Sequence, residues 1–330
     1  MKNVVIAAAS ALLLSIPFGI VVGCGGSPKV TTTSPTTPVT PVTPGNPSNP
    51  TSSPAQSPMA AFLEQEGSGE RSIYTATNDG SGLTTVSGPS RGFNSVYVLP
   101  DGSKGVFAAR VDDGYSQIFY LAPFSSNATP IQLTTTPSHK TGAMLSADGS
   151  QITFMQERSG QVLPEEYSFD IAVMNADGSN LHVLPLPFGL NFLHPFFSPD
   201  GSKITGAISM MGCFGECSVF TVNVDGTDFT RITPGGADGI LAVAPAFSPD
   251  GKQVVFSSVG WGDVSLYIVN SDGSGLQRLG WTNAGWGDPL YVAGRLMFVG
   301  NNQIYSMKPD GTDVKLVTGY AYAGFDMPIL

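Results

Sequence analysis

Charged side chains are scarce in this 330-residue chain, since Asp, Glu, Lys and Arg together make up only 12% of it. An average soluble domain has about twice that share. A helical bundle needs many Glu, Lys and Arg residues on its outer faces, so the composition argues against one. The 40 glycines follow no period of three, which excludes a collagen-like chain. Wholesale disorder is excluded because 41% of the residues are hydrophobic. A turn-rich, all-β protein remains.

Basic residues are few in residues 59–330, the part of the chain that we expect to fold. This part contains 13 Lys and Arg residues and all 25 acidic ones, which gives a formal charge of −12. Phosphate groups are bound by clustered Lys and Arg, so the sequence predicts no nucleic-acid partner. The same deficit argues against adsorption to an anionic membrane surface.

Residues 1–23 have the pattern of an export signal, with Lys2 at a positive start and an apolar run after it. A plain secretory signal would end in an A-x-A-like site. Here Val21-Val22-Gly23-Cys24 places a small residue directly before a cysteine. This arrangement resembles the lipobox of bacterial lipoproteins, which implies that Cys24 is lipidated and becomes the mature N-terminus. The alternative is an uncleaved membrane anchor, although Pro17 interrupts the run and the run is short for a span.

A linker follows the signal, with nine prolines in residues 28–58 and mostly Thr, Ser, Val and Asn between them. Such a stretch cannot bury a core and favours extended polyproline II. We therefore expect residues 24–58 to be a disordered tether between a membrane and a folded domain at residues 59–330.

Short motifs centred on Asp-Gly recur through the folded part. The sequence Phe-Ser-Pro-Asp-Gly occurs at residues 197–201 and again at 247–251, with weaker copies at 99–102 and 146–149. A second family of Asp-Gly turns interleaves with the first, at Asp79, Asp177, Asp225, Asp272 and Asp310. Asp-Gly between apolar runs is typical of a β-hairpin, because Gly tolerates positive φ and Asp caps the turn. Each repeat of about 50 residues therefore contains four strands, which we name A to D, as in a propeller blade.

The pattern F-S-P-D-G plus I-Y-x-x-N-x-D-G-[ST] resembles the TolB-type (WD40-like) β-propeller repeat over nearly all of residues 59–330. Strand A begins at Ser95, Gly142, His194, Ala244 and Asp288, and residues 59–88 supply three strands without an A strand. The chain ends with Met327–Leu330, which matches the A strand at Ala244–Phe247. We therefore predict a six-bladed propeller of four-stranded blades, closed by the C-terminal strand. Calcium loops are an alternative use of the turns, but no copy has the D-x-[DN]-x-[DN]-G-x₅-E pattern, so we predict no metal and no cofactor.

Antiparallel order puts the A–B and C–D turns on one face of the propeller and the B–C loops and D–A links on the other. The second face, the loop face, carries the irregular segments, and such loops on a rigid frame are where binding usually resides. Its aromatic, methionine and charged side chains have the makeup of a protein or glycan contact surface. The candidates are Arg110, Arg158, Glu165, Tyr167, His194, Met211, Phe214, Trp261, Asp263, Trp286 and Asp288. In the alternative interpretation, Trp261 and Trp286 fill gaps between blades.

Cys213 and Cys217 are the remaining cysteines beside Cys24. In an exported protein, two nearby cysteines in a loop are expected to pair, so we predict a disulfide between them. The alternative is half of a metal site, which would need two more ligands.

Catalytic groups are sparse. The three histidines fall in different blades or links, and the G-x-S-x-G match at residues 88–92 lacks the strand-to-helix context of a nucleophile. Asp263 and Asp288 are the carboxylates that could form a glycan-cleaving pair at the channel mouth. We predict a non-catalytic, monomeric envelope lipoprotein, facing the periplasm or the cell exterior, that binds a protein or glycan. The alternative is a lyase or hydrolase acting on polysaccharide or peptide.

The TolB-type resemblance implies a periplasmic, protein-binding role. The chain departs from that family in having the Pro/Thr linker where the family carries an α/β domain, and in its own lipobox.

Overall fold

The computed structural model describes most of residues 59–318. The gaps within this range are residues 66–70, 78–83, 91–92, 94, 100, 159–168, 188–189, 210–216, 236–241, 260–263, 283–288, 293 and 301–302. Every regular element in the described part is a β-strand. The same residues contain no helix with the length and apolar character needed to cross a membrane.

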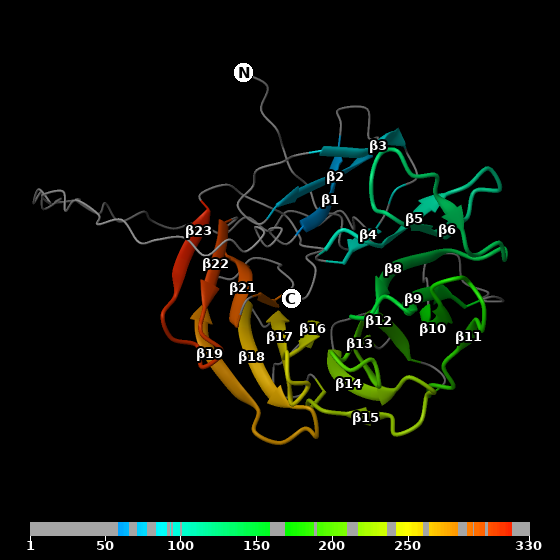
Figure 1. The fold of residues 1–330 in the computed structure, drawn as a ribbon. Coiled ribbons are helices and arrows are strands. Elements are labelled where there is room, and N and C mark those ends of the chain that lie inside the picture. Colours follow the sequence, from blue (N-terminus) through cyan, green and yellow to red (C-terminus); the bar gives the residue numbers. More distant parts are fainter. Residues whose placement is uncertain are drawn as a thin grey trace, which may run out of the picture. The chain divides into compact units, whose positions relative to one another are not determined.

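The described strands form six antiparallel sheets, which follow one another in chain order (Figure 1). The first has three strands, β1 (Met59–Gln65), β2 (Arg71–Thr77) and β3 (Thr84–Ser90). Each of the other five has four strands lying side by side in chain order. These strands are β4 (Ser95–Val98), β5 (Gly105–Arg110), β6 (Ser116–Leu121), β7 (Ile131–Gln132), β8 (Lys140–Leu145), β9 (Gln151–Glu157), β10 (Phe169–Asn175), β11 (His182–Val183), β12 (Asn191–Phe197), β13 (Lys203–Ser209), β14 (Cys217–Asn223), β15 (Thr230–Arg231), β16 (Ala242–Phe247), β17 (Gln253–Val259), β18 (Val264–Asn270), β19 (Gln277–Thr282), β20 (Leu290–Val292), β21 (Arg295–Gly300), β22 (Gln303–Met307) and β23 (Lys315–Thr318).

The prediction of an all-β chain of four-stranded units is confirmed, and the repeat phase is correct. Strands β4, β8, β12 and β16 contain the predicted A-strand starts at Ser95, Gly142, His194 and Ala244. The first sheet has three described strands, in agreement with an A strand that residues 59–88 do not supply. The strand predicted at residues 327–330 lies outside the described part, so closure stays a prediction.

Hydrogen bonds explain why Phe-Ser-Pro-Asp-Gly makes a turn between strands A and B. Between β12 and β13, the Asp200 carboxylate accepts from the Ser198 hydroxyl (2.6 Å) and from the Ser202 amide (3.1 Å). The bond from the Ser198 side chain is the largest cause that lowers the pKa of Asp200. Gly201 has φ of 71°, a value that suits glycine. The turns at Asp101, Asp148 and Asp250 use the same carboxylate bonds to residue i+2.

The C–D turns are built in a similar way. Asp177, Asp225, Asp272 and Asp310 each accept hydrogen bonds from the amide and hydroxyl of the Ser or Thr two residues later. The residue after that Ser or Thr has a left-handed conformation in all four turns, at Asn180, Asp228, Gly275 and Asp313. Both families of Asp-Gly motifs therefore act as turn chemistry.

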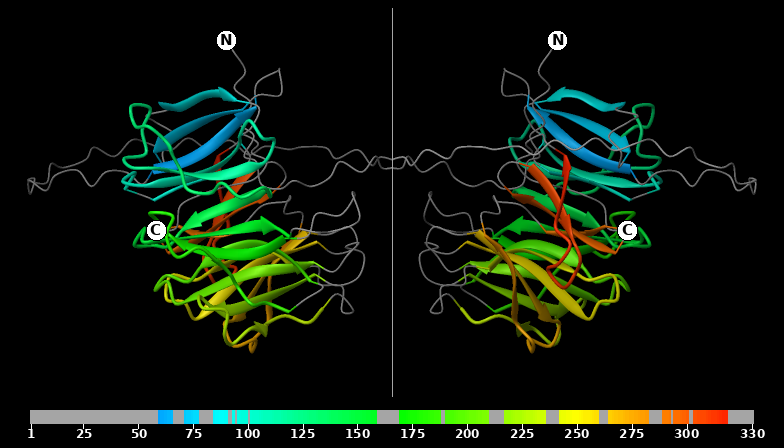
Figure 2. Two further views of the ribbon diagram at one scale, coloured as in Figure 1. Left: turned by 90° about the vertical axis from the view of Figure 1, so that its right-hand side faces the viewer. Right: turned by 90° about the vertical axis from the view of Figure 1, so that its left-hand side faces the viewer.

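The hydrophobic core lies between neighbouring sheets, because each buried cluster joins one sheet to the next. Strand β5 shows how one strand serves two interfaces. Val106 and Ala108 pack with the third sheet, whereas Phe107 and Ala109 pack with the first. Successive side chains of a strand point to opposite faces, so a strand between two sheets must be apolar on both. The side views show the first sheet, in blue, beside the second, in cyan (Figure 2).

The outermost strands are short in three consecutive sheets. β7, β11 and β15 each have two residues, whereas β19 has six and β23 has four. Some of their apolar side chains face solvent, and Ile131 in β7 is 58% exposed.

Candidate functional site at the loop face

The structure describes three of the residues predicted for the loop face, namely Arg110, Arg158 and His194. The others lie outside the described residues: Glu165, Tyr167, Met211, Phe214, Trp261, Asp263, Trp286 and Asp288. Cys24 and Cys213 also lie outside them. Cys217 is the first residue of β14 and is buried. Because Cys213 is not among the described residues, the disulfide between the two stays a prediction.

Arg110 is exposed and ends strand β5. The connection that follows it is a tight turn rather than an irregular loop. The Gly114 amide donates to the Val111 carbonyl (2.9 Å), and the Tyr115 amide donates to the Asp113 carboxylate (2.9 Å). This turn is another use of the Asp-Gly chemistry, here on the loop face.

Arg158 braces the base of the longest B–C connection. Its guanidinium binds the Asp170 carboxylate through two nitrogens and donates a further bond to the Leu190 carbonyl (3.2 Å). Asp170 itself lies in β10, paired with Gln156 in β9, so the two strands continue further into this connection than the sequence predicted. The hydrogen bond that Arg158 donates to the Asp170 carboxylate is the largest cause that raises the pKa of Arg158. Arg158 thus joins β9 and β10 to the segment before β12.

His194 lies in a β-bulge of strand β12, where its register with β13 shifts between Leu193 and Phe196. Its φ is 52°, which is uncommon for a residue other than glycine. The same position is left-handed in β8 and β16, at Gly142 and Ala244, and the register shifts there as well. The bulge is therefore a repeated feature of these A strands and not a local property of His194.

A buried polar network that the sequence analysis missed lies where the loop face joins the second and third sheets. At its centre is Lys140, the first residue of β8, with a side chain that is 0% exposed. Its ammonium donates to the carbonyls of Thr136 (2.9 Å) and Ser138 (2.8 Å) and to the Ser138 hydroxyl (2.9 Å). Gln117 in β6, also fully buried, donates to the Thr136 carbonyl (2.9 Å) and accepts from the Thr134 hydroxyl (2.7 Å).

Three half-buried side chains form a rim above this network: Tyr115, His139 and Glu157. The His139 amide donates to the Glu157 carboxylate (2.9 Å), and the Glu157 amide donates back to the His139 carbonyl (2.8 Å). The ring of His139 accepts at Nδ1 from the Ser116 amide (3.3 Å), so the neutral ring carries its proton on Nε2. Tyr115 packs edge-on against that ring, with 5.3 Å between centroids. We call Tyr115, His139 and Glu157 the rim.

The electrostatics of Lys140 are unusual but do not make it a catalytic group. Burial lowers the pKa of Lys140 to about 8, although the nearby carboxylates of Asp113 and Glu157 act in the opposite direction. A buried amine with a shifted pKa is a common mark of an active site. Here, however, the ammonium has three donors and all three are bound to the link that precedes β8. The described residues also contain no group of three or more His, Cys, Asp and Glu side chains that could hold a metal ion.

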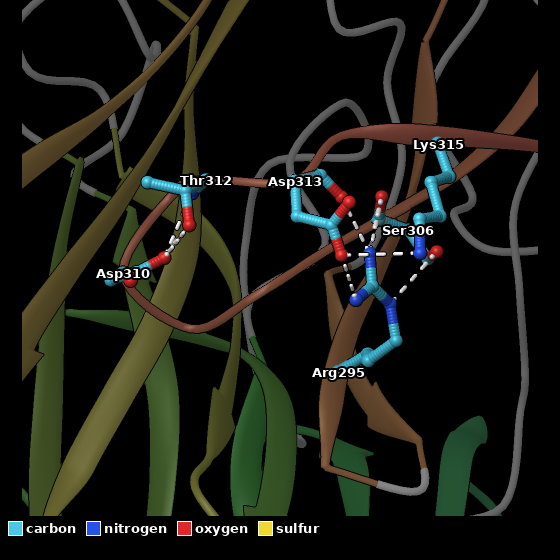
Figure 3. A network of polar contacts seen from close by, with 6 residues as sticks. All are labelled: Arg295, Ser306, Asp310, Thr312, Asp313 and Lys315. Atoms are coloured by element: carbon cyan, nitrogen blue, oxygen red, sulfur yellow. Dashed lines mark hydrogen bonds and ion pairs between the residues drawn. The ribbon is translucent and has the colours of Figure 1, made fainter.

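The opposite face carries a network of another kind, at the turns of the last sheet (Figure 3). The β22–β23 turn keeps the Asp310 turn chemistry, whereas the β20–β21 turn has no Asp-Gly motif and is followed by Arg295. Its guanidinium donates to the side chain (2.8 Å) and the carbonyl (2.6 Å) of Asp313, and to the Ser306 hydroxyl (3.2 Å). Lys315 approaches the same Asp313 carboxylate at 3.2 Å. These bonds connect the β20–β21 turn to the β22–β23 turn. They also pair the positive charges of Arg295 and Lys315 with the negative charge of Asp313.

The comparisons with known proteins agree with this architecture. No protein-family model matches the chain. The "Tol-Pal system protein TolB" of Francisella tularensis subsp. mediasiatica is 34% identical over 113 residues, which cover 34% of this chain and 25% of that protein. The chain thus matches only a quarter of that relative's length.

Two solved structures are similar in fold. The structure of TolB from Acinetobacter baumannii matches 81% of this chain and 65% of its own, with a TM-score of 0.61 and 16% identity. Oligogalacturonate lyase from Vibrio parahaemolyticus matches 78% of this chain and 73% of its own, with a TM-score of 0.55 and 12% identity. At these low sequence identities, the two structures show that the fold is shared and nothing about function.

Four-stranded antiparallel sheets that pack face to face in chain order define the domain as a β-propeller. Its Asp-Gly repeats resemble those of TolB-type propellers, and a third of the chain is similar in sequence to a TolB protein.

Proposed function

We propose that this protein is an exported, lipid-anchored envelope protein whose propeller binds a protein partner through the loop face and catalyses no reaction. The observation that carries the proposal is the rim of Tyr115, His139 and Glu157, whose side chains are half-buried and held by hydrogen bonds and ring packing. Side chains that are already ordered lose little entropy on binding, and an aromatic group beside charged ones is typical of a contact surface. We prefer a protein to a glycan because the matched relative is named as part of a protein system.

Ring closure is the second part of the proposal. Five sheets have four strands and the first has three, so one further strand would complete a ring of equal blades. Residues 327–330 resemble the A strand at residues 244–247 and are the segment that we assign to this place. A closed ring would leave no long unpaired edge between the first and last sheets.

The location follows from the N-terminal pattern. Cys24 follows an export signal and would carry the lipid, and residues 28–58 would hold the propeller away from the membrane. At about 3.1 Å per residue, such a linker reaches roughly 95 Å. The side that it faces is the periplasm or the cell exterior.

The absence of catalysis is supported by the way the charged groups of the described loop face are used. The Lys140 donors are bound to two backbone carbonyls and to the Ser138 hydroxyl, Arg158 is paired with Asp170, and Glu157 accepts from the His139 amide. Each of these groups is already engaged in a hydrogen bond or an ion pair within the protein, which argues against its use as a general base. The alternative, an enzyme acting on polysaccharide or peptide, would have to rely on Asp263 and Asp288.

Photo-crosslinking tests the binding face. A photoreactive residue is placed at Asp112, which is exposed beside the rim, and in a separate chain at Asp310, which is exposed on the opposite face. With the full-length chain in its native envelope, we expect one defined protein adduct from position 112 and none from position 310. An adduct from position 310 alone, or none from either, would rule out the loop face as the binding surface.

A cleavage screen tests the enzyme alternative. Polysaccharides and peptides are incubated with the full-length chain and with its Asp288→Asn variant. We expect no cleavage by either protein. Reproducible cleavage that disappears in the variant would overturn the non-catalytic proposal and support a lyase or hydrolase.

A further inference from the structure

We infer that Lys140 and Gln117 are positioning residues of the loop face: they hold the link at residues 134–139 in one conformation and so fix the rim. The inference rests on the proposed function only in treating the rim as a binding surface. The structural part of the inference, that a buried pair of side chains orders the half-buried rim, can be tested without any partner.

The first step concerns the carbonyls of the link, which runs from β7 to β8 outside any strand ladder. Buried carbonyl groups need hydrogen-bond partners, and Ser138 in the link is buried, although Thr136 is exposed. Lys140 supplies bonds to the carbonyls of Thr136 and Ser138, and Gln117 supplies a second bond to Thr136. Two side chains beneath the link therefore help to fix its conformation, together with the Ser138 amide, which donates to the Thr136 carbonyl (2.8 Å), and the Gln132 side chain, which donates to the Thr134 carbonyl (2.8 Å).

The second step is that the fold does not require a lysine at this place. Lys140 stands two residues before the left-handed Gly142 of strand β8. In β12 and β16 the corresponding residues, two before His194 and Ala244, are Phe192 and Ala242, and both are fully buried and apolar. A charge in this position costs desolvation, as the lowered pKa of Lys140 indicates. A buried charge is a poor source of stability, so we infer that Lys140 contributes to the specificity of the link's conformation.

The third step connects the link to the rim. His139 is the last link residue before Lys140, and its amide, ring and carbonyl are bonded to Glu157, Ser116 and the Glu157 amide, respectively. Tyr115 packs on the His139 ring. A change in the conformation of the link therefore displaces His139 and breaks the contacts that order the other two rim residues.

Amide hydrogen exchange of the full-length protein tests whether Lys140 orders the link and the rim. In Lys140→Met, a side chain of similar length without charge, we expect amides of residues 134–139 and 115–118 to exchange about tenfold faster, because one or two hydrogen bonds' worth of local stability is lost. The matched control is Lys104→Met, since the Lys104 ammonium also donates to a carbonyl, that of Gly149 (2.9 Å), but at the opposite face. We expect the control to leave the rim amides unchanged.

A pH series on the wild type supplies a test that needs no variant to fold. The charged groups that act on Lys140 are Asp113 in the β5–β6 turn and Glu157 at the end of β9, and His139 is its neighbour in the link. Opening of the link would expose Lys140 and return its pKa from about 8 to 10.5, so the closed link gains stability as the pH rises between these two values. After correction for intrinsic exchange rates, we expect protection of residues 134–139 to rise as the pH passes through about 8, and to show no such step in Lys140→Met.

The outcomes separate this inference from the proposed function. Unchanged exchange of the link in Lys140→Met with no step in the wild type, or faster exchange spread evenly over all the sheets, would refute positioning by Lys140. A looser rim with an unchanged crosslink from position 112 would support positioning and refute the rim as the binding surface. If the crosslink is lost in Tyr115→Ala while the link stays protected in Lys140→Met, the rim is supported as the binding surface and positioning by Lys140 is refuted.

Discussion

The ring of Phe220 lies directly against Gly206 in the neighbouring strand of the fourth sheet. A Cβ atom on Gly206 would come within 2.7 Å of that ring and 3.0 Å of the Leu193 carbonyl oxygen. Gly206 pairs with Phe220 across β13 and β14, so neither strand can move away without breaking the ladder. The glycine is required here by close approach and not by its φ.

We therefore expect Gly206→Ala to destabilise the protein by about 1–3 kcal/mol, as overpacking of a core does. Chemical denaturation of the full-length chain measures the free energy of unfolding. The double variant Gly206→Ala/Phe220→Leu should recover part of the loss relative to Phe220→Leu alone, because the smaller side chain leaves room. An unchanged denaturation midpoint in Gly206→Ala would contradict the close contact.

Tyr291 offers a prediction of the opposite sign. Its side chain is 2% exposed, and its hydroxyl has no hydrogen-bond partner in the described part of the chain. Burial, with a smaller effect of Asp250, raises the pKa of Tyr291 to about 12. Removing an unsatisfied buried hydroxyl should stabilise a protein, so we expect Tyr291→Phe to raise the free energy of unfolding by about 1 kcal/mol. Tyr267→Phe, at a half-buried tyrosine, serves as the comparison, and a loss of stability specific to Tyr291→Phe would mean that the hydroxyl is bonded.

Acid should weaken the turns built on aspartate. The folded-state pKa of Asp200 is lowered below 3.8, first by the Ser198 hydroxyl and then by the amide and hydroxyl of Ser202. A lowered carboxylate pKa contributes stability that is present above pH 3.8 and disappears as the pH falls through the folded-state value. In Asp200→Asn we expect stability to depend less on pH below 3.8 than in the wild type. Ser198→Ala should act in the same direction, and equal slopes in all three proteins would exclude this explanation.

Lys140 should give a pH dependence in the alkaline range. Its pKa is about 8 in the folded chain against 10.5 for an ordinary lysine, so between these values the unfolded chain binds the extra proton. Stability then rises with pH, because the cost of the buried charge disappears. Relative to Lys140→Met, we expect the wild type to gain up to about 3 kcal/mol from pH 7 to pH 10.5. A constant difference between the two proteins over this range would show that Lys140 does not titrate there.

The repeats predicted the architecture well because Asp-Gly turns have a strict local chemistry. A motif such as Phe197–Gly201 contains its own hydrogen-bond donors and acceptors, so the turn follows from the residues themselves. The strand pattern between the turns then determines which sheet each segment joins.

The candidate site was harder to predict because it depends on residues that are distant in sequence. Gln117 and Lys140 meet only when β6 and β8 are placed beside each other. One signal was present, since aligning the repeats puts Lys140 where Phe192 and Ala242 stand, and a lysine in a buried apolar position has to find partners. The bulges at His194 and Ala244 had a weaker signal, because alanine rarely adopts a positive φ and histidine does so only in a minority of cases.

The two-residue length of β7, β11 and β15 protects the protein against aggregation through its sheet edges. A second chain can extend a sheet only by pairing with free backbone groups along its edge, and two residues offer too few to hold a strand. Growth of these sheets by strand addition therefore stops at the periphery, although Ile131 is exposed there. The six-residue β19 is the longest outer edge among the described four-stranded sheets, and it is the place where association between copies would begin.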